Sequence, residues 1–484
     1  MAEIIPHWLT KQAYLSPNQP AIETVNGSTL TFSELMRQSQ DLAKRLANLG
    51  ISNGTHVGVL SNNNTTMILV IHALSYLGAV CVLLNTRLTP DELNYQIHDA
   101  EVEMVISQDE LLDKANQLKV KQVKGFSEVR KEAQLEVQLV SEINLDDPFT
   151  IIYTSGTTGF PKGVIHTYGN HWWSAIGSVL NLGLSNKDKW LAVLPYFHVG
   201  GLSIFMKSVI YGMPVYLVEK FNEQIVLDAI MNRGVTIASV VTVMVQRILE
   251  VLGQNHFPTH FRCMLLGGGP APVPLLEQAN DRRIPIFQSF GMTETSSQIV
   301  TLSPRDALKK IGSAGKPLFP AQVQIMGADS SGIGEIFVKG PMVTNGYFNN
   351  QEANERSFQE GWLATGDLGY LDEEGFLYVV DRRKDLIISG GENIYPSEIE
   401  SVLSACNGVR EVGVTGKPDV YWGEIPIAFI VRSTEKINEE DILQFAEKHL
   451  ARYKLPKEIY FVGELPRNAS NKLVRSMLLD LLEK

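Results

Sequence analysis

Short apolar runs alternate with longer amphipathic stretches through most of the chain, and this alternation limits the possible folds more than any other feature. Runs such as 56–60, 190–194 and 214–218 are typical of buried strands, whereas 32–49 has the apolar period of a helix. Strands that alternate with helices predict an α/β fold with β-sheets flanked by helices.

The pattern changes at Gly334, after which strand-like runs and turns predominate up to a charged segment at 381–385. A chain of 484 residues is too long for one ordinary core. The residues after the charged segment have apolar, strand-like runs at 409–414 and 425–431 and a helix-like stretch near 439–449, enough for a small α+β domain. We therefore predict a large N-terminal part of several subdomains at 1–380 and a C-terminal domain at 381–484.

Composition narrows the classes of function. The formal net charge of −11 argues against a surface that neutralises nucleic-acid phosphates. Cys81, Cys263 and Cys406 lie far apart and form no metal-ligand or disulfide pattern, so we expect reduced thiols. The chain starts without the basic and apolar regions of a secretory signal, which predicts a cytoplasmic location.

The most apolar segment, 67–84, is as long as a short membrane span but is interrupted by His72, Ser75 and Gly78. Its apolar residues suit a buried helix followed by a strand. We therefore predict no membrane span.

An apolar strand at 151–154 runs into a loop rich in hydroxyls and glycines that ends at Lys162. Glycines let backbone N–H groups approach phosphate oxygens, the hydroxyls add donors, and the lysine adds a positive charge. The spacing differs from that of the Walker loop. A flexible surface turn is the alternative, but it leaves the dense set of Ser and Thr unexplained. The predicted polyphosphate site consists of Thr154, Ser155, Gly156, Thr157, Thr158 and Lys162.

At this loop the sequence resembles the adenylate-forming superfamily, which includes acyl-CoA synthetases, peptide-synthetase adenylation domains and luciferases. Further motifs of that family recur in order along essentially the whole chain. The resemblance implies an acid–thiol ligase that uses ATP and Mg²⁺ to activate a small-molecule carboxylate as its acyl-adenylate. The acyl group then passes to coenzyme A, and the small C-terminal domain is mobile.

The segment at 289–295 resembles the part of the family that holds adenine, phosphate and magnesium. On that resemblance Phe290, where members commonly carry Tyr, stacks on adenine. Thr293 contacts phosphate and Glu294 binds Mg²⁺. Taken alone, Glu294 would more often be a solvated carboxylate. The resemblance also assigns to the ATP or AMP site Ser289, Gly291 and Met292.

Two glycine-containing segments resemble elements that enclose the nucleotide. The segment at 266–270 resembles the strand end over adenine, where Gly268 and Gly269 permit close backbone approach. The segment at 365–367 resembles the ribose-binding element, in which Asp367 accepts hydrogen bonds from two hydroxyls. By itself, an ordinary Gly-Asp turn would be the preferred interpretation.

The two remaining family motifs lie in the C-terminal part of the chain. The charged segment resembles the family's hinge, with Asp381 as the pivot and Arg382 near the ribose; an exposed turn is the alternative. The segment at 465–473 resembles the motif of the catalytic lysine. It assigns Lys472 to the bond between carboxylate and α-phosphate, with a solvated lysine as the alternative. Asn471 stands where members usually have Gly.

Three segments, 170–175, 195–201 and 296–301, resemble the branch of the family that ligates 2-succinylbenzoate to coenzyme A in menaquinone biosynthesis. That acid has a second carboxylate, so its pocket needs donors or a cation. The candidates for the acyl pocket are His198, Lys207, Ser297 and Gln298, with a hydrogen-bonded core histidine as the alternative for the first. The candidates for coenzyme A phosphates are Arg452 and Lys454, with solvated charges as the alternative.

Other functions stay open at this point. A ligase for another aryl or fatty acid shares every catalytic motif. An amino-acid adenylation enzyme typically has Asp where this chain has His198, and a nucleotide-binding protein without catalysis would lack Lys472. The sequence is also compatible with a homo-oligomer.

Overall fold

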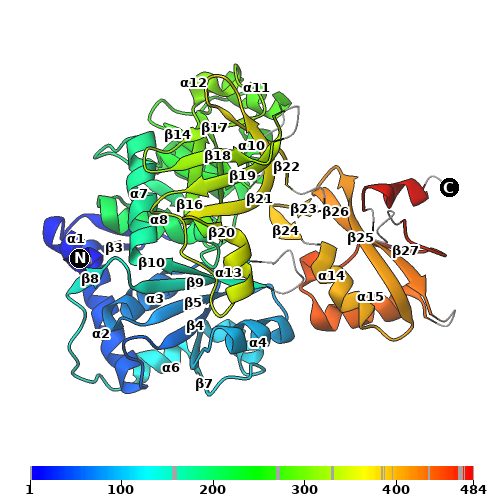
Figure 1. The fold of residues 1–484 in the computed structure, drawn as a ribbon. Coiled ribbons are helices and arrows are strands. Elements are labelled where there is room, and N and C mark those ends of the chain that lie inside the picture. Colours follow the sequence, from blue (N-terminus) through cyan, green and yellow to red (C-terminus); the bar gives the residue numbers. More distant parts are fainter. Residues whose placement is uncertain are drawn as a thin grey trace.

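The computed structural model describes residues 3–154, 161–268, 273–328, 332–382, 385, 387–394, 396–433, 437–466, 473 and 475–482. In the described residues, a large N-terminal domain contains two large sheets and one two-stranded sheet, and a small C-terminal domain lies to one side of it, drawn in orange and red (Figure 1). The predicted α/β fold with a separate small α+β domain is therefore confirmed. The last strand of the large sheet ends at Arg382 and the next strand begins at Ile387.

The first sheet has six strands in the described part of the chain. Its inner strands are parallel and buried on both faces, as expected for apolar runs in an α/β domain. The order across the sheet is β10 (Lys162–Thr167), β9 (Pro148–Thr154), β5 (Val80–Leu84), β4 (His56–Leu60), β6 (Met104–Ser107) and β7 (Gln122–Gly125). Among these six described strands, only β10 runs antiparallel to its neighbour, which is β9.

The second sheet continues through 14 strands of the described chain, parallel in its centre and antiparallel toward β18. Its order is β18 (Gln322–Met326), β19 (Gly334–Lys339), β21 (Trp362–Leu371), β22 (Leu377–Arg382), β17 (Ser313–Pro317), β16 (Ser297–Leu302), β15 (Ile286–Met292), β14 (Cys263–Gly267), β13 (Ile237–Val241), β11 (Trp190–Ala192), β12 (Val215–Leu217), β2 (Pro20–Thr24) and β3 (Thr29–Thr31), with β20 (Phe358–Gln359) beside β21. A separate pair is formed by β1 (Ile4–Pro6) and β8 (Glu142–Asn144).

Helices cover the faces of both sheets. Those of the large domain are α1 (Trp8–Leu15), α2 (Phe32–Asn48), α3 (Thr65–Leu77), α4 (Pro90–Asp99), α5 (Leu112–Ala115), α6 (Phe126–Lys131), α7 (Tyr168–Leu182), α8 (Val199–Tyr211), α9 (Glu223–Asn232), α10 (Thr242–Leu252), α11 (Val273–Asp281), α12 (Pro304–Ala307) and α13 (Gln351–Ser357). The start of α2 shows why these helices begin where they do. The Thr31 side chain accepts from the Glu34 amide, and the Glu34 carboxylate accepts from the Thr31 amide.

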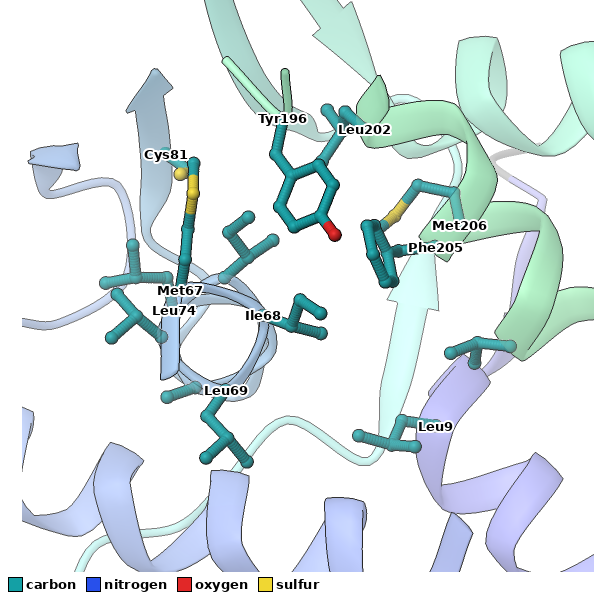
Figure 2. Packing of buried hydrophobic residues seen from close by; sticks show 14 of the residues in the cluster. Leu9, Met67, Ile68, Leu69, Leu74, Cys81, Tyr196, Leu202, Phe205 and Met206 are labelled. Carbon is teal, nitrogen blue, oxygen red and sulfur yellow. The ribbon is translucent and has the colours of Figure 1, made fainter. Parts of the chain in front are cut away.

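The main hydrophobic core lies between the two sheets. Ile68 of α3 points toward Phe205 and Met206 of α8, whereas Met67 extends toward Cys81 of β5, and Leu9 of α1 lies at one side (Figure 2). All residues of α3 from Met67 to Leu77 are buried, and β5 follows directly. The predicted buried helix and strand are thus confirmed, and none of the described helices has the length and hydrophobicity of a membrane span.

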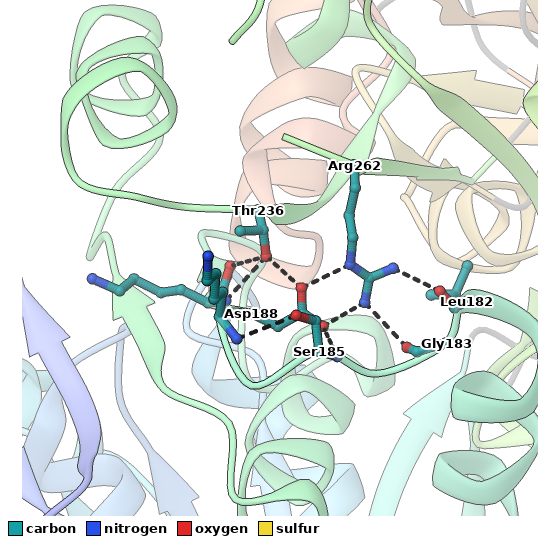
Figure 3. Close-up of polar contacts among 8 residues, drawn as sticks. Leu182, Gly183, Ser185, Asp188, Thr236 and Arg262 are labelled. Carbon is teal, nitrogen blue, oxygen red and sulfur yellow. Dashed lines mark hydrogen bonds and ion pairs between the residues drawn. The ribbon is translucent and has the colours of Figure 1, made fainter. Parts of the chain in front are cut away.

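A buried ion pair ties the end of α7 to the second sheet (Figure 3). Arg262 donates from Nε and Nη2 to the two carboxylate oxygens of Asp188, at 2.7 and 2.6 Å. Arg262 also donates to the carbonyls of Leu182 and Gly183, while Thr236 donates to Asp188. Burial is the largest single influence and opposes ionisation of Asp188, but the hydrogen bonds from Arg262, Ser185 and Thr236 and the charge of Arg262 together lower the pKa of Asp188.

The C-terminal domain has its own five-stranded sheet and its own core. The strand order is β24 (Glu392–Ile394), β23 (Ile387–Ser389), β26 (Gly423–Arg432) and β25 (Val409–Asp419), with β27 (Glu458–Phe461) also beside β26. The helices α14 (Pro396–Ser404) and α15 (Glu439–His449) cover one face. The helix predicted near 439–449 is therefore confirmed as α15.

The three cysteines are buried and free, as predicted. Burial raises the pKa of Cys263 to about 12 and also raises the pKa of Cys81 and of Cys406. The thiols are therefore protonated at neutral pH.

Candidate functional site

A cavity of about 570 Å³ lies where the strand ends of the large domain meet the C-terminal domain. Residues from most of the predicted motifs line it, although they come from widely separated parts of the chain. The predicted site residues in its wall are Thr154, Lys162, His198, Gly268, Ser289, Gly291, Met292, Thr293, Glu294, Ser297, Gln298, Asp367 and Lys454. The C-terminal domain contributes Gly390, Gly391, Glu392 and Tyr453 as well.

Several predicted residues lie outside the described part of the chain. These are Ser155, Gly156, Thr157, Thr158, Gly269 and Lys472. Asp381 and Arg382 are described by their backbone, in β22 opposite Leu368 and Asp367 of β21. Their side-chain roles, and the hinge, stay predictions.

The ends of the predicted phosphate loop are fixed by the hairpin of β9 and β10. Thr154 and Lys162 are direct cross-strand partners, and both line the cavity. Lys162 is buried, and its Nζ lies 4.8 Å from the centre of the Tyr347 ring. The hairpin therefore directs a buried cation to the base of the loop.

The turn after β15 presents Thr293 and Glu294 to the cavity. Glu294 is only 6% exposed, and the Tyr347 hydroxyl donates to its Oε1 at 3.0 Å. The Thr344 amide donates to the Glu294 carbonyl at 2.8 Å. Main chain and side chain of Glu294 are thus both held by the segment at 344–347.

Two histidines extend this support behind Thr293. The Nε2 of His166 lies 2.7 Å from the Thr293 carbonyl, so this nitrogen must carry the proton. Its Nδ1 then accepts from Thr150, whose hydroxyl is also 3.0 Å from Nε2 of His171. Burial lowers the pKa of His166 to about 4, and it also lowers the pKa of His171. Both imidazole rings are therefore neutral at neutral pH.

The backbone is strained next to this turn. Ser296 and Ser297 have φ values of 57° and 151°, which L-residues rarely adopt. Gly291 allows this, because a Cβ there would lie 2.2 Å from the Ser297 carbonyl. The Thr295 hydroxyl donates to that carbonyl at 2.7 Å, and the Ser296 hydroxyl donates to the Met342 carbonyl. Such strain points to a functional position.

The predicted adenine and ribose elements lie in the same wall. Gly268 follows the last residue of β14 with φ +85°. Ser289 donates to the Leu266 carbonyl at 3.0 Å, which joins the two predicted adenine segments. Asp367 is 6% exposed and lies in β21, and its amide donates to the Thr365 hydroxyl.

Phe290 is the one described nucleotide residue that the structure positions differently from the prediction. Side chains alternate along a strand, so the residue between Ser289 and Gly291 of β15 points away from the cavity. The Phe290 ring packs instead in a hydrophobic cluster with Ile299, Val300 and neighbouring residues. Stacking of adenine on this ring is therefore not supported by the side-chain position.

A buried cation, Lys207, lies behind Ser297 and is not itself among the residues that line the cavity. Lys207 is 1% exposed, and its Nζ donates to the Ser297 hydroxyl at 3.3 Å and lies 5.3 Å from the Trp190 ring. Burial lowers the pKa of Lys207 to about 7. Beside it, both amide atoms of Gln298 are buried without a hydrogen-bond partner in the described chain. These groups need a polar ligand.

The C-terminal domain closes the other side of the cavity. Glu392 accepts a hydrogen bond from Arg87 of the large domain and lies 3.5 Å from Nε2 of His198. Partial burial, which leaves 42% of the side chain exposed, and to a smaller degree Arg87, lower the pKa of His198. Gly391 packs against Val241, where a Cβ would approach to 3.2 Å.

The two predicted coenzyme A residues have different environments. Arg452 is exposed. Lys454 is 4% exposed and lies between Glu92 of the large domain and Glu398 of its own domain, at 2.9 and 2.6 Å. Burial opposes the charge, but Tyr453 and the two carboxylates raise the pKa of Lys454. A contact of either residue with coenzyme A stays a prediction.

The described residues fit a magnesium ion that bridges the enzyme and a polyphosphate. Magnesium in such sites takes one or two carboxylates and completes its shell with phosphate oxygens and water. Glu294 supplies a buried carboxylate at the cavity, close to Thr293 and the base of the predicted phosphate loop. The described part of the chain has no cluster of three or more His, Cys, Asp or Glu side chains that could hold a metal ion.

Comparison with protein families matches residues 9–348 to "AMP-binding enzyme" and residues 398–472 to "AMP-binding enzyme C-terminal domain". These matches cover most of the chain.

The chain belongs to the AMP-binding enzyme family.

Members of this family include close relatives of the chain. The 2-succinylbenzoate--CoA ligase of Oceanobacillus iheyensis is 58% identical over 480 residues, which are 99% of this chain and 100% of that protein. Among solved structures, o-succinylbenzoate CoA synthetase (MenE) from Bacillus subtilis is similar in two states. A double mutant bound to the product analogue OSB-NCoA is 46% identical, covers 99% of this chain and 98% of its own, and has a TM-score of 0.94. The complex with ATP and magnesium ion is 45% identical, covers 99% and 100%, and has a TM-score of 0.77.

The two TM-scores differ although both structures are of one enzyme, apart from two substitutions. The difference therefore reflects how the chain is arranged in space. The present member of the AMP-binding enzyme family has an arrangement closer to that of the product-analogue complex than to that of the ATP complex.

Four groups of functional interest were missed by the sequence reasoning for this AMP-binding enzyme. They are Tyr347 beside Glu294, the series of hydrogen bonds that runs from His171 through Thr150 and His166 to Thr293, the Arg87–Glu392 pair, and Glu92 beside Lys454. Tyr347 follows Gly346, and a Gly-Tyr pair after a strand is a weak local signal. The others have no local signal, because each depends on a partner far away in the chain.

Proposed function

We propose that this member of the AMP-binding enzyme family is a 2-succinylbenzoate–CoA ligase that acts in menaquinone biosynthesis. It converts the acid, ATP and coenzyme A into 2-succinylbenzoyl-CoA, AMP and diphosphate. The name of the Oceanobacillus iheyensis relative and the OSB-NCoA ligand of the Bacillus subtilis structure support this substrate. A cytoplasmic location and a homo-oligomer belong to the same proposal.

The observation that carries the proposal is the buried cation behind Ser297. Lys207 has no carboxylate within ion-pair distance among the residues that the structure describes. A buried ammonium without a counter-ion is costly, so this position favours an anionic ligand. The carboxylate of 2-succinylbenzoate that is not activated would supply the missing charge. Gln298 would donate or accept a hydrogen bond at the same end.

In the first half-reaction, an oxygen of the activated carboxylate attacks the α-phosphorus of ATP, and diphosphate leaves. Lys162 and Thr293 would contact the phosphates, and Lys472 would align the two anions that must meet. Glu294 would hold Mg²⁺, which when bound offsets phosphate charge. Asp367 would bind the ribose hydroxyls, and Gly268 and Ser289 would border the adenine.

In the second half-reaction, the thiol of coenzyme A releases its proton to solvent, its sulfur attacks the acyl carbonyl carbon, and the bond from that carbon to the AMP oxygen breaks so that AMP leaves. The C-terminal domain would then border the acyl-adenylate with Gly390, Gly391 and Glu392, which line the cavity. Neither glycine has a side chain that could extend into the cavity, and a Cβ at Gly391 would approach Val241 to 3.2 Å. Arg452 would contact coenzyme A phosphates from the exposed surface, and the domain would rotate about Asp381 between the half-reactions.

The test measures ATP- and coenzyme A-dependent AMP release with 2-succinylbenzoate, benzoate and octanoate. We expect a strong preference for 2-succinylbenzoate, and we expect Lys472→Ala to abolish AMP release with every acid. Preference for benzoate or octanoate would overturn the substrate and leave the ligase chemistry intact. No AMP with any acid would overturn both.

A further inference from the structure

One segment of the C-terminal domain, residues 451–454, packs directly against α4 of the large domain. Ala451 is 1% exposed and belongs to a hydrophobic cluster that includes Leu88, Leu93 and Ile97 from α4 and the residues just before it. Tyr453 packs against the same cluster. Apolar contacts of this kind add affinity between the domains but little directional preference.

Directional preference comes from Lys454 in the same segment. Its ammonium donates to Glu92 Oε1 at 2.9 Å and to Glu398 Oε1 at 2.6 Å, and all three side chains are less than 10% exposed. Glu92 and Lys454 lie 362 residues apart in sequence and in different domains, whereas Glu398 lies on α14 in the same domain as Lys454. Of the two hydrogen bonds that Lys454 donates to carboxylates, only the one to Glu92 therefore depends on how the two domains are arranged.

The contact between Glu92 and Lys454 can break without leaving a buried charge unpaired, because each of the two residues has a second partner within its own domain. When the domains separate, Lys454 keeps Glu398 as its counter-ion because both belong to the same domain. Glu92 keeps its other oxygen, Oε2, on the amide and hydroxyl of Thr89 at the start of α4. A carboxylate in the first turn of a helix is also favoured by the helix dipole. Opening therefore leaves each group with a partner.

We propose that Glu92 and Lys454 form a reversible interdomain clasp that holds the C-terminal domain in the arrangement for transfer of the acyl group to coenzyme A. They are positioning residues, and neither contacts the reacting atoms in this role. The arrangement is the one in which Gly390, Gly391 and Glu392 line the cavity, and it is closer to the product-analogue complex than to the ATP complex. The inference rests on the proposed ligase function.

The test separates the two half-reactions in Glu92→Gln. A glutamine at this position can still accept the hydrogen bonds of the Thr89 cap, so the start of α4 is preserved. Asp91→Asn is the matched control, because it removes one negative charge from the same first turn of α4 at an exposed position. Lys454→Met and the double variant complete a mutant cycle. Diphosphate release without coenzyme A reports the first half-reaction, and quenched-flow transfer from preformed acyl-adenylate reports the second.

We expect Glu92→Gln to slow transfer about tenfold at saturating coenzyme A, because fewer molecules occupy the competent arrangement. Its diphosphate release should stay within about twofold of the wild type, and its KM for coenzyme A should not change. Asp91→Asn should behave as the wild type in both steps. The double variant should transfer the acyl group no more slowly than Lys454→Met does, because both substitutions remove the same contact between Glu92 and Lys454.

Three results would overturn the clasp. A lower KM for coenzyme A in Glu92→Gln would mean that Lys454 is released to bind coenzyme A phosphates. Equal slowing of both half-reactions would mean that Glu92 only supports the fold of α4, and wild-type rates in both would mean that the contact is dispensable. The test can use whichever acid the wild type activates. An error in the proposed substrate would therefore appear in the acid preference of the wild type, whereas an error in the proposed clasp would appear in the half-reaction rates of Glu92→Gln.

Discussion

Two buried ion clusters of this protein look alike but hold different things together. In the first, Arg262 meets Asp188 with two hydrogen bonds and also contacts two carbonyls, all within the large domain (Figure 3). In the second, Lys454 meets one carboxylate of its own domain and one of the other domain. The groups of the first cluster never separate, so it stabilises the fold. The second stabilises one arrangement of two folded domains.

The comparison shows that burial alone does not determine what a buried ion pair stabilises. A pair within one domain stabilises the fold, whereas a pair between two domains stabilises their arrangement. A pair that is broken by removal of one partner leaves an uncompensated charge. A pair that opens by domain movement leaves none when each member keeps a second partner, as Glu92 and Lys454 do. Their effects should therefore appear in different measurements.

The largest effect on stability is expected for Arg262→Met. It leaves Asp188, whose side chain is 1% exposed, without its cation, and should lower the free energy of unfolding by about 3 kcal/mol. Urea denaturation followed by far-ultraviolet circular dichroism measures this as a lower midpoint. The control is Lys121→Met, which removes an exposed pair with Glu103 and should cost about 0.5 kcal/mol or less. Equal midpoints for the two variants would contradict the structural role of the first cluster.

A third buried cation, Lys207, sharpens the comparison because no carboxylate of the described chain pairs with it. Lys207→Met should raise the KM for 2-succinylbenzoate by about 30-fold, or about 2 kcal/mol, through loss of a charged hydrogen bond. The KM for benzoate, which has no second carboxylate, should hardly change.

The same residue predicts a pH dependence with a definite sign. Burial lowers the pKa of Lys207 to about 7, so the ammonium that binds the anion is lost as the pH rises above 7. The KM of the wild type for 2-succinylbenzoate should therefore increase by up to about tenfold per pH unit above that value, while Lys207→Met stays flat. Between pH 7 and the ordinary lysine pKa the unfolded chain binds the extra proton, so this group makes folding more favourable as the pH rises. A flat wild-type profile would contradict the assignment.

The smallest effect on stability is expected for Glu92→Gln. Because Lys454 keeps Glu398 and the α4 cap is preserved, the free energy of unfolding should change by about 0.5 kcal/mol or less. The same urea titration measures it beside Arg262→Met. A loss as large as that of Arg262→Met would show that the second cluster also stabilises the fold, and the comparison would fail.

Much of the fold was predictable because its signals are local. The apolar run at 67–84 gave a buried helix and strand, and the helix at 439–449 agrees with α15 at both ends. Strand lengths were less predictable. β25 continues to Asp419, five residues beyond the apolar run, because its extent is set by pairing with β26. The continuous second sheet could not be predicted either, since β2 lies beside β12 and no local pattern specifies that partner.

The candidate site likewise has a part that local sequence motifs predicted and a part that depends on partners far away in the sequence. The motifs that carry Lys162, Glu294 and Asp367 do line one cavity, as their residue types indicated. Phe290 shows the limit of a motif, because the alternation of β15 directs its ring into the core. Arg452 and Lys454 were equivalent in sequence, yet one is exposed and the other buried. The difference depends on Glu92, which no reading of the segment around Lys454 could supply.

The state of the cysteines makes the domain arrangement accessible to spectroscopy. Cys81, Cys263 and Cys406 are buried, and their protonated thiols should react slowly with maleimide dyes. New cysteines introduced at exposed positions on either side of the clasp could therefore be labelled without first removing the native ones. Energy transfer between two such dyes would report the separation of the domains while the enzyme works through its catalytic cycle.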